Sequence, residues 1–369
     1  MSKVAILTQP LGTNYGGILQ AFALQHVLRE MGHQPITIDR RAHLSPFFQA
    51  GSFMKGGLLW AMGKQSHIRR QPNAKERAMI YRHTHRFIHE HIVMSETIYS
   101  TETLRQYAVK EQFDAYMVGS DQVWRKAYSP CMPNFFLDFL PEESRAKRMA
   151  YAASFGVDKW QFSPRETKQY TALAKRFDAI SVREDSAVSL CRDHLGVEAT
   201  HVLDPTMLVD RSVYEGLAMS RYAHPSKGDL FCYILDRTPE KMKQVTQIAE
   251  MKGLTPFELL PEPFCNRNTT SFEECVMPPV EQWLRSFMDA KYVITDSFHG
   301  TVFSLILGLN CTVAPNPRRG LSRFESLISM LDIQHDIKNG LVSLQGWGCD
   351  AKVDPIKNSS VRYLDAILK

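Results

Sequence analysis

The chain has no closely spaced pair of cysteines. Its seven cysteines, an odd number, are scattered along 369 residues, and none forms the CxxC spacing of zinc sites. Several lie inside apolar, strand-like runs, for example Cys232 in residues 230–235. Thiols placed in this way are expected to be buried and reduced, so the sequence argues against a disulfide framework and predicts no metal site.

The sequence also lacks a long hydrophobic run. Stretches such as residues 302–309 are far shorter than the roughly 20 apolar residues that a membrane helix needs. Residues 1–9 lack the charged and then apolar pattern of a secretion signal and indicate a buried strand instead. We therefore expect a cytoplasmic protein, and peripheral contact with the inner face of the membrane stays open.

The formal net charge of +5 is concentrated in one segment. Residues 64–91 hold seven Lys or Arg and two Glu, together with five of the thirteen histidines. One hypothesis is that this segment contacts an anionic, polyprenyl-diphosphate-linked glycan or the membrane surface that carries it. The alternative is a solvated helix that covers the first domain. Nucleic-acid binding is not expected, because the segment matches no known binding module.

Strand-like and helix-like segments alternate along almost the whole chain, which predicts an α/β fold with parallel sheets. Residues 4–8 form an apolar run that precedes a glycine-bearing loop, a helical pattern at residues 18–31 and a second strand at residues 35–39. A chain of this length favours two domains.

We expect two Rossmann-like, doubly wound domains that face a central cleft. The first should span residues 1–170 and the second residues 171–345, with the strand-like runs at residues 179–182 and 200–203 opening the second series. Residues 346–369 form a tail that can pack back on the first domain. In such folds ligands bind at the carboxyl ends of the strands.

Three strand-to-helix junctions carry residues that a buried core does not require. They are Asn14-Tyr15-Gly16-Gly17, Ser120-Asp121-Gln122-Val123-Trp124 and Asp296-Ser297-Phe298-His299-Gly300-Thr301. Adjacent glycines let a ligand approach the backbone, and the following helix offers free N–H groups to an anion. These junctions are therefore candidate binding and catalytic segments.

Each junction also has a structural explanation. The two glycines could serve only a tight turn, and Ser120 or Asp121 could only cap a helix. In the functional alternative, Asp121 accepts a proton from a sugar hydroxyl and Trp124 stacks on the sugar ring. For His299 the functional explanation is favoured, because the residue lies at a helix N-terminus, beside a hydroxyl and a carboxylate, where an anion would bind.

Arg183 ends a strand at its turn into a helix. A guanidinium binds carboxylate or phosphate through two parallel hydrogen bonds, which a lysine cannot do. The alternative is a surface ion pair with Glu184 or Asp185.

Together these segments resemble the polysaccharide pyruvyltransferase family. The matching segments are Asn14-Tyr15-Gly16-Gly17, Gly119-Ser120-Asp121-Gln122-Val123-Trp124, Tyr151-Ala152-Ala153-Ser154-Phe155-Gly156, Ser181-Val182-Arg183-Glu184, Leu203-Asp204-Pro205-Thr206 and Asp296-Ser297-Phe298-His299-Gly300. No single segment is diagnostic, but six in the right order, from about residue 12 to residue 310, are specific. Residues 64–91 and the tail after about residue 340 do not contribute.

The resemblance implies a fold similar to that of GT-B glycosyltransferases and a transferase activity. The donor would be phosphoenolpyruvate, as a co-substrate and without a cofactor. The acceptor would be a hydroxyl pair of a hexose or hexosamine, converted to a cyclic ketal in cell-surface polysaccharide synthesis. The first domain would hold the acceptor and the second the donor.

The resemblance also implies that Arg183 and His299 bind the donor and catalyse. The complete set of expected site residues is His299, Asp121 and Asp296 for catalysis, Arg183, Ser297, Gly300 and Thr301 for the donor, and Asn14, Tyr15, Gly16, Gly17, Ser120, Gln122 and Trp124 for the acceptor.

The chemistry of the reaction fits these residue types. The donor carries a carboxylate and a phosphate, which need fixed cations and N–H donors. A protonated His299 could protonate the vinyl carbon or stabilise the leaving phosphate, and Asp121 or Asp296 could accept the hydroxyl proton. The assignment of acid and base among the three stays open.

Two other functions fit the same pattern. A nucleotide-sugar-dependent glycosyltransferase of the same fold would also need a cleft and a phosphate-binding helix N-terminus. A non-catalytic protein that binds a glycan or phosphate could also have kept the fold. The non-catalytic alternative is disfavoured, because strand ends carry Arg183, His299 and Asp121 together.

Overall fold

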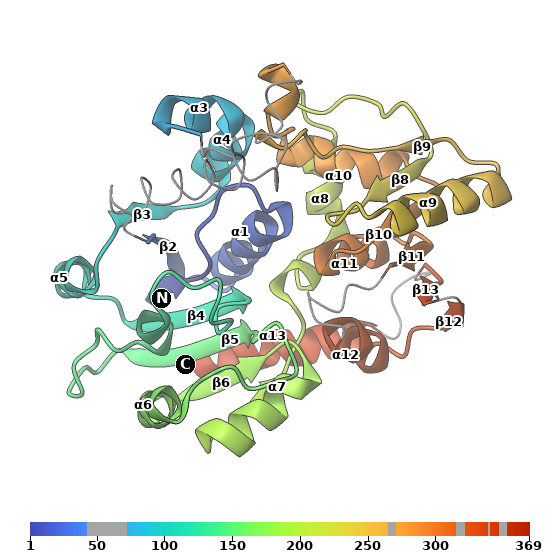
Figure 1. Ribbon diagram of the computed structural model, residues 1–369. Coiled ribbons are helices and arrows are strands. Elements are labelled where there is room, and N and C mark those ends of the chain that lie inside the picture. The colour runs from blue at the N-terminus through green and yellow to red at the C-terminus, as the bar shows by residue number, and fades with distance from the viewer. Residues whose placement is uncertain (43–71, 265–270, 315–321, 339, 347–352) are drawn as a thin grey trace, which may run out of the picture.

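The computed structural model describes residues 1–42, 72–264, 271–314, 322–338, 340–346 and 353–369. In these residues the chain forms two α/β units, each built on its own sheet, with helices packed between the sheets (Figure 1). Both termini lie in the first unit, because the last helix returns to it.

The first sheet has seven parallel strands in the order β3-β2-β1-β4-β5-β6-β7. Their bounds are β1 Lys3–Leu7, β2 Gln34–Arg40, β3 Met94–Ile98, β4 Ala115–Asp121, β5 Lys147–Ala153, β6 Ala179–Val182 and β7 Thr200–His201. The strand order reverses between β1 and β4, so the loops that leave these two strands diverge and open the crevice in which such sheets bind ligands.

Helices cover both faces of this sheet (Figure 1). They are α1 Tyr15–Glu30, α3 Ala74–Ile80, α4 Arg82–His91, α5 Thr101–Glu111, α6 Pro164–Ala174 and α7 Asp185–Leu190. Local signals set several of their ends. For α6, Ser163 and Glu166 form a capping box and Pro164 occupies the first turn.

The second sheet has six strands in the order β12-β13-β11-β10-β8-β9. Their bounds are β8 Leu230–Tyr233, β9 Pro256–Phe257, β10 Tyr292–Thr295, β11 Cys311–Val313, β12 His335–Lys338 and β13 Leu341–Leu344. Strands β8 to β11 pair in parallel, whereas β12 and β13 are antiparallel. Its helices are α8 Arg211–Ala218, α9 Pro239–Lys252, α10 Val280–Asp289, α11 Phe298–Ile306 and α12 Ser322–Met330. The predicted α/β fold with two Rossmann-like units is confirmed.

The expected boundary between the units at residue 170 is wrong. Strand β6 pairs with β5, and β7 pairs with β6, so both belong to the first sheet. The sequence analysis placed these two strands at the start of the second series, because two alternating β/α patterns in succession do not reveal where one sheet stops. The first sheet ends at His201, and the second begins at Leu230.

One apolar cluster extends from the first sheet to the second. It contains Val4 and Met117 from the first sheet and Phe231 and Val293 from the second. The alternate residues of the same strands face two separate outer clusters, which α5 and α6 cover on the first unit and α9 on the second. The two units therefore share a core.

The C-terminal helix α13, Val353–Leu368, packs against the first unit. The backbone N–H of Leu203 donates a hydrogen bond of 3.1 Å to Ser360 Oγ, and Lys147 Nζ donates one of 3.3 Å to the carbonyl of Ile367. Leu364 is completely buried.

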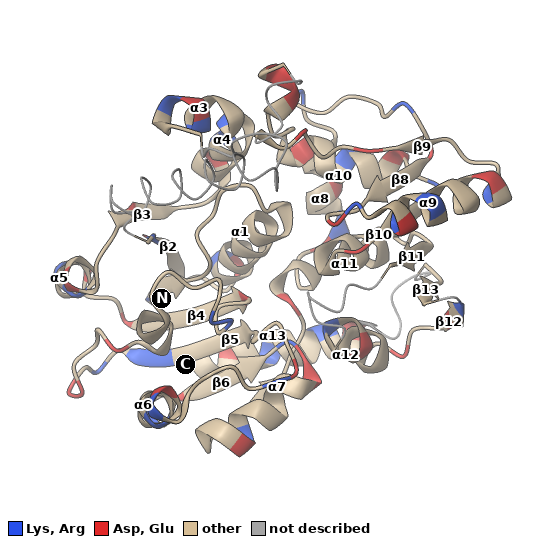
Figure 2. Cartoon of the chain, in the orientation of Figure 1, with Lys and Arg blue, Asp and Glu red and all other residues tan. Residues whose placement is uncertain are grey.

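The described part of the basic segment joins the two units. Residues 64–71 lie outside the described residues, but α4 contacts α10 of the second unit. Arg86 forms ion pairs with Glu281 at 2.7 Å and with Glu90 at 2.6 Å, and Arg82 forms one with Glu273 at 2.8 Å. Over the rest of the chain, acidic and basic residues are intermixed on both units (Figure 2).

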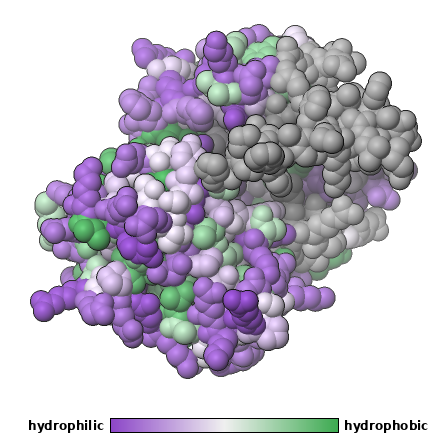
Figure 3. Space-filling model, turned by 60° about the vertical axis from the view of Figure 1, so that its left-hand side comes forward, coloured by the Kyte–Doolittle hydropathy of each residue, from purple (hydrophilic) through white to green (hydrophobic). Residues whose placement is uncertain are grey.

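Among the described residues, no helix is long and apolar enough to cross a membrane. Among the residues that are coloured on the face in Figure 3, hydrophilic ones predominate and hydrophobic ones form small separate spots.

Candidate active site

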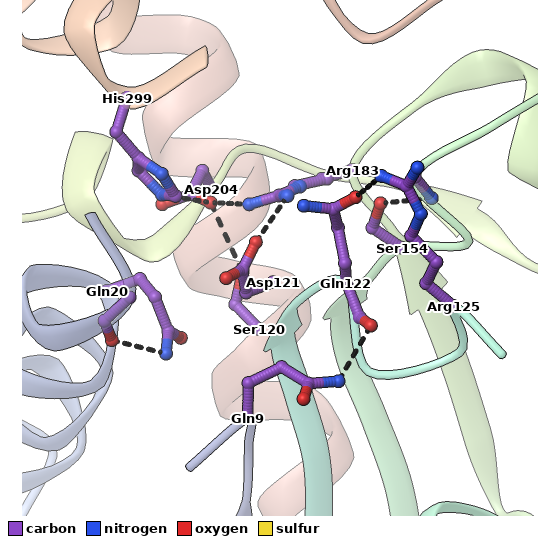
Figure 4. Close-up of polar contacts among 12 residues, drawn as sticks. Gln9, Gln20, Ser120, Asp121, Gln122, Arg125, Ser154, Arg183, Asp204 and His299 are labelled. Carbon is purple, nitrogen blue, oxygen red and sulfur yellow. Dashed lines mark hydrogen bonds and ion pairs between the residues drawn. The ribbon is translucent and has the colours of Figure 1, made fainter. Parts of the chain in front are cut away.

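A buried charged cluster lies where the first sheet meets the N-terminus of α11 (Figure 4). Asp121 ends β4, Arg183 follows β6, Asp204 follows β7 and His299 lies in the first turn of α11. The structure thus brings together three predicted site residues, Arg183, Asp121 and His299, and adds Asp204 between them.

Arg183 is the centre of the cluster. Its side chain has no exposed surface, and it forms ion pairs of 2.7 Å with Asp121 and 2.8 Å with Asp204. Its Nε atom lies 3.8 Å from Glu184 Oε2. Burial by itself would lower the pKa of Arg183, but the carboxylates of Asp121, Asp204 and Glu184 raise it above its ordinary value. The alternative of a surface ion pair is therefore wrong, because the pairing with Glu184 is internal.

Asp204 presents one oxygen to three donors. Its Oδ2 atom accepts hydrogen bonds from Arg183 Nη1 at 2.8 Å and from Ser120 Oγ at 3.2 Å, and it lies 3.6 Å from His299 Nε2. Burial would raise the pKa of Asp204, but His299 and Arg183 hold it far below its usual range. Asp204 belongs to one of the six matching segments, but no role was predicted for it from the sequence.

Asp121 has a left-handed backbone, with a φ of 68°. Aspartate tolerates this conformation better than most residues, and it turns the carboxylate out of the strand toward Arg183. Burial would raise the pKa of Asp121, but the charges of Arg183, His299 and Arg323 lower it below its ordinary value. Asp121 is therefore an ionised partner of Arg183.

The imidazole of His299 is enclosed between two helix N-termini. A Cβ atom on Gly16, in the first turn of α1, would lie 2.2 Å from His299 Nδ1, so this glycine permits the close approach of α1 to the ring. His299 is 6% exposed, and among the described residues its Nε2 has no hydrogen-bond partner. The positive ends of α1 and α11 both point to this position, which favours an anion.

Two further charged residues of the cluster were missed by the sequence analysis. Arg323, near the start of α12, is 5% exposed, and its guanidinium lies 5.5 Å from the centre of the Phe298 ring, on which Arg183 also packs at 4.5 Å. Burial and the charge of Arg183 lower the pKa of Arg323 to about 10. No motif marks it in the sequence. Glu184 was considered only as a surface partner, but it is completely buried and its Oε1 accepts a hydrogen bond of 2.7 Å from Ser154 Oγ.

Asp296 is not part of the cluster. Its carboxylate accepts hydrogen bonds from the backbone N–H groups of Leu235 and Asp236, at 2.7 and 3.0 Å, and forms an ion pair of 2.7 Å with Lys241. These contacts hold the loop between β8 and α9. The Asp296 carboxylate is thus bonded to groups of the second unit.

Two residues predicted to contact the acceptor are core residues instead. The Trp124 indole is 1% exposed, stacks on Phe136 at 5.3 Å and donates its N–H to the carbonyl of Phe135. Tyr15 is completely buried, stacks on Trp283 of the second unit at 5.6 Å and donates its hydroxyl to Pro278. Neither ring has a face available for a sugar, so both assignments are corrected.

The remaining residues of the third junction shape the start of α11. Ser297 Oγ accepts a hydrogen bond from the N–H of Gly300 at 3.3 Å, and Thr301 Oγ1 donates one to the carbonyl of Ser297. A Cβ atom on Gly300 would lie 2.3 Å from Thr295 Oγ1. These three residues fix the helix turn on which His299 stands.

The other expected acceptor residues differ in exposure. Asn14 is exposed at the start of α1 and makes no side-chain capping bond, whereas Gly17 is buried against it. Ser120 is buried with its hydroxyl bonded, and half-buried Gln122 accepts a hydrogen bond of 2.6 Å from Arg125. Of this group, Asn14 and Gln122 could contact a ligand without unfolding the site.

Cavities lined by described residues occur away from the cluster. One of about 620 Å³ lies between α4 and β2, and its lining includes Asp39, Arg41 and His85. Glu90, His91 and Glu281 are close enough to one another to bind a metal ion, but the Arg86 guanidinium already pairs with both carboxylates. This group is therefore best explained as an ion-pair cluster.

A family model described as polysaccharide pyruvyl transferase matches residues 14–316. A search of curated proteins found no match.

Solved structures with a similar course of the chain include two epimerases and a glycosyltransferase. The UDP-GlcNAc 2-epimerase from Methanocaldococcus jannaschii has 13% identity and a TM-score of 0.48, with 99% of each chain covered. The UDP-GlcNAc 2-epimerase from Neisseria meningitidis has 9% identity and a TM-score of 0.46, over 89% of this chain and 86% of that one. A glycosyltransferase from Streptomyces sp. SF2575 has 10% identity and a TM-score of 0.34, over 100% of this chain and 96% of that one. At these values the likenesses carry no information about the substrate of this chain.

The family match includes every segment on which the resemblance rested, from Asn14 to Gly300. It also includes Asp121, Arg183, Asp204 and His299, which the fold brings into one buried cluster. The chain belongs to the polysaccharide pyruvyl transferase family.

Proposed function

We propose that the chain transfers a pyruvyl group from phosphoenolpyruvate to two hydroxyls of a hexose or hexosamine, in the synthesis of a cell-surface polysaccharide. The observation that carries this proposal is the position of His299, buried between the N-termini of α1 and α11 and beside Arg183. The acceptor in this proposal is a glycan carried on a polyprenyl diphosphate at the inner face of the membrane.

The charges around the Phe298 ring support a dianionic donor. Arg183 and Arg323 both pack on this ring, and burial together with the charge of Arg183 lowers the pKa of Arg323. A bound carboxylate or phosphate relieves the repulsion between two buried guanidinium groups. Free N–H groups at the two helix N-termini add donors for the phosphate oxygens.

The reaction balances with protons alone. A proton is added to the methylene carbon of the donor, and the first sugar hydroxyl attacks the neighbouring carbon as its own proton leaves. The bond from that carbon to the phosphate oxygen then breaks, and inorganic phosphate departs. The second hydroxyl attacks the same carbon and loses its proton, which closes the cyclic ketal.

His299 is placed to act as the acid. A protonated imidazole at this position can give its proton to the methylene carbon or to the leaving phosphate. Asp121 remains a candidate to accept a hydroxyl proton, although its pairing with Arg183 makes it a weak base. Asp296 is no longer proposed as the base, because its carboxylate is bonded to the β8–α9 loop.

The proposal is tested by phosphate release and product mass with phosphoenolpyruvate and a panel of simple glycosides. The His299→Asn variant should lose at least about 100-fold in turnover, because general acid catalysis is removed. The same change at exposed His89, His89→Asn, is the matched control and should leave turnover unchanged.

Thermal unfolding with each ligand separates the alternatives. Phosphoenolpyruvate should raise the melting temperature of the wild type, and uridine diphosphate should not. The opposite result, together with no phosphate release from any glycoside, would favour a nucleotide-sugar glycosyltransferase. Near-normal turnover of His299→Asn would remove this residue from the mechanism.

A further inference from the structure

The orientation of the Asp204 carboxylate is fixed from both sides. Its Oδ1 atom accepts hydrogen bonds from the backbone N–H and the hydroxyl of Thr206, at 3.1 and 2.8 Å. The carboxylate therefore cannot rotate without breaking two bonds, and Oδ2 stays directed toward Ser120, Arg183 and His299. A buried carboxylate held in this way has a defined electrostatic effect on each neighbour.

Asp204 also lies where the chain passes from one unit to the other. It follows β7, the last strand of the first sheet, and precedes the short helical turn Pro205–Met207, which contacts both α1 and α11. Arg183 belongs to the first sheet and His299 to the second unit. The same oxygen thus lies within 4 Å of a basic side chain from each unit.

We propose that Asp204 is a positioning residue that holds the His299 imidazole directed at the donor and couples it to Arg183. The inference rests on the proposed function of this site. Opposite charge within about 4–6 Å favours the charged form of an imidazole. Without Asp204, the neighbours of His299 would include the buried Arg183 guanidinium and two helix N-termini, which favour the neutral form of an imidazole.

Other titratable groups lie around Asp204, Arg183 and His299. Asp121 binds the far side of Arg183, and Glu184 lies against Arg183 Nε. The hydroxyl of Tyr151 donates to the carbonyl of Leu203, and that of Tyr214 donates to the carbonyl of Thr206. Burial raises the pKa of both tyrosines, so they stay neutral over the working pH range. Asp204 is therefore the anion nearest to His299 Nε2 among the described contacts.

The test is the pH dependence of kcat for the wild type and for Asp204→Asn, with phosphoenolpyruvate and an accepted glycoside. Removing the carboxylate should move the alkaline limb of the profile to lower pH, because a nearby opposite charge favours the charged form of an imidazole. It should also lower kcat, because the imidazole loses the carboxylate that holds its orientation. The KM for phosphoenolpyruvate reports separately on Arg183.

Asp121→Asn is the comparison variant. Asp121 binds Arg183 at almost the same distance as Asp204 does but forms no ion pair with His299. This variant should raise the KM for phosphoenolpyruvate and move the alkaline limb less than Asp204→Asn does. If Asp204→Asn does not fold, Thr206→Val supplies the test, because loss of one bond to Oδ1 should produce a smaller shift in the same direction.

The outcomes separate the two proposals. A wild type that releases no phosphate from phosphoenolpyruvate with any glycoside overturns the proposed function. An active wild type whose alkaline limb coincides with that of Asp204→Asn, or of Thr206→Val in its place, overturns the role of Asp204 alone.

Discussion

At the scale of single residues, the site is a set of buried charges that stabilise one another. Arg183 has no exposed side-chain surface, and its partners Asp121 and Asp204 are almost equally buried. Such groups contribute little net stability, because well-packed apolar residues of similar volume often do as well. Buried ionised groups with displaced pKa values occur preferentially at functional sites, which supports the proposal that this cluster binds a ligand.

Gly16→Ala should damage the site without unfolding the protein. The added methyl group would lie 2.2 Å from His299 Nδ1, so the ring must leave its position in the site. We expect turnover to fall about 100-fold, as misplacement of a catalytic group by about 1 Å can do. Alanine is the better helix former by about 1 kcal/mol, which offsets part of the steric cost. Turnover and melting temperature are the measurements.

The control for this change is Gly216→Ala in α8. A Cβ atom there meets nothing within 4 Å, so the variant should keep full activity and gain slightly in stability. Equal activity of the two variants would show that the close contact between Gly16 of α1 and the His299 ring does not matter for turnover.

At the scale of elements, α4 works as a connection between the units. Its Phe87 and Ile88 face the shared core, while Arg86 reaches Glu281 on α10 and lies 3.4 Å from the centre of the Tyr222 ring. The sequence analysis identified the high positive charge of this segment but not its partners. The glutamates that neutralise it are about 190 residues away in the chain, where periodicity and composition give no signal.

Arg86→Met should destabilise the protein by about 2 kcal/mol, measured by urea unfolding. The change leaves the Glu281 carboxylate, which is only 2% exposed, without its guanidinium partner. The double variant Arg86→Met/Glu281→Met should recover much of the loss, because it removes the unpaired charge as well.

Arg82→Met on the same helix is the matched control. Its pair with Glu273 is exposed by 42% and 68%, so we expect a change of no more than about 0.5 kcal/mol. Equal destabilisation by the two single changes would contradict the role given to Arg86.

At the scale of the whole molecule, the two units share one apolar core. Residues of both sheets and of helices α1, α4, α10, α11 and α13 contribute to it. Large apolar interfaces oppose independent motion of domains. The cluster of Arg183, Asp204 and His299 lies at this junction, so its geometry depends on the packing of both units.

The stability of the whole molecule should fall in acid. Folding holds the pKa values of Asp121 and Asp204 below their ordinary values, so below about pH 4 the unfolded chain binds more protons than the folded one. The stabilisation from these two groups is complete above that pH and is lost as the pH falls toward their folded pKa values. Urea unfolding between pH 3 and about pH 7 measures it.

Asp204→Asn should be less stable than the wild type at neutral pH and should approach it in acid. The asparagine variant lacks the carboxylate whose protonation costs the wild type its stability. A constant difference between the two curves over this pH range would contradict the assignment.

The sequence by itself determined the local features of this protein. Alternation of apolar runs and helical patterns predicted the α/β fold with two Rossmann-like units. The glycine-bearing junction before α1 and the position of His299 at the start of α11 were also readable, because each depends on residues within one turn of the chain.

Only the tertiary structure decided which sheet β6 and β7 join, that Trp124 and Tyr15 belong to the core, and that Asp296 is used elsewhere. It also decided that Asp204 stands between Arg183 and His299. The reason is physical. Strand pairing and buried ion pairs are made by groups far apart in the chain, such as Arg183 with Asp121 62 residues earlier, and their energies depend on the burial that the assembled core creates.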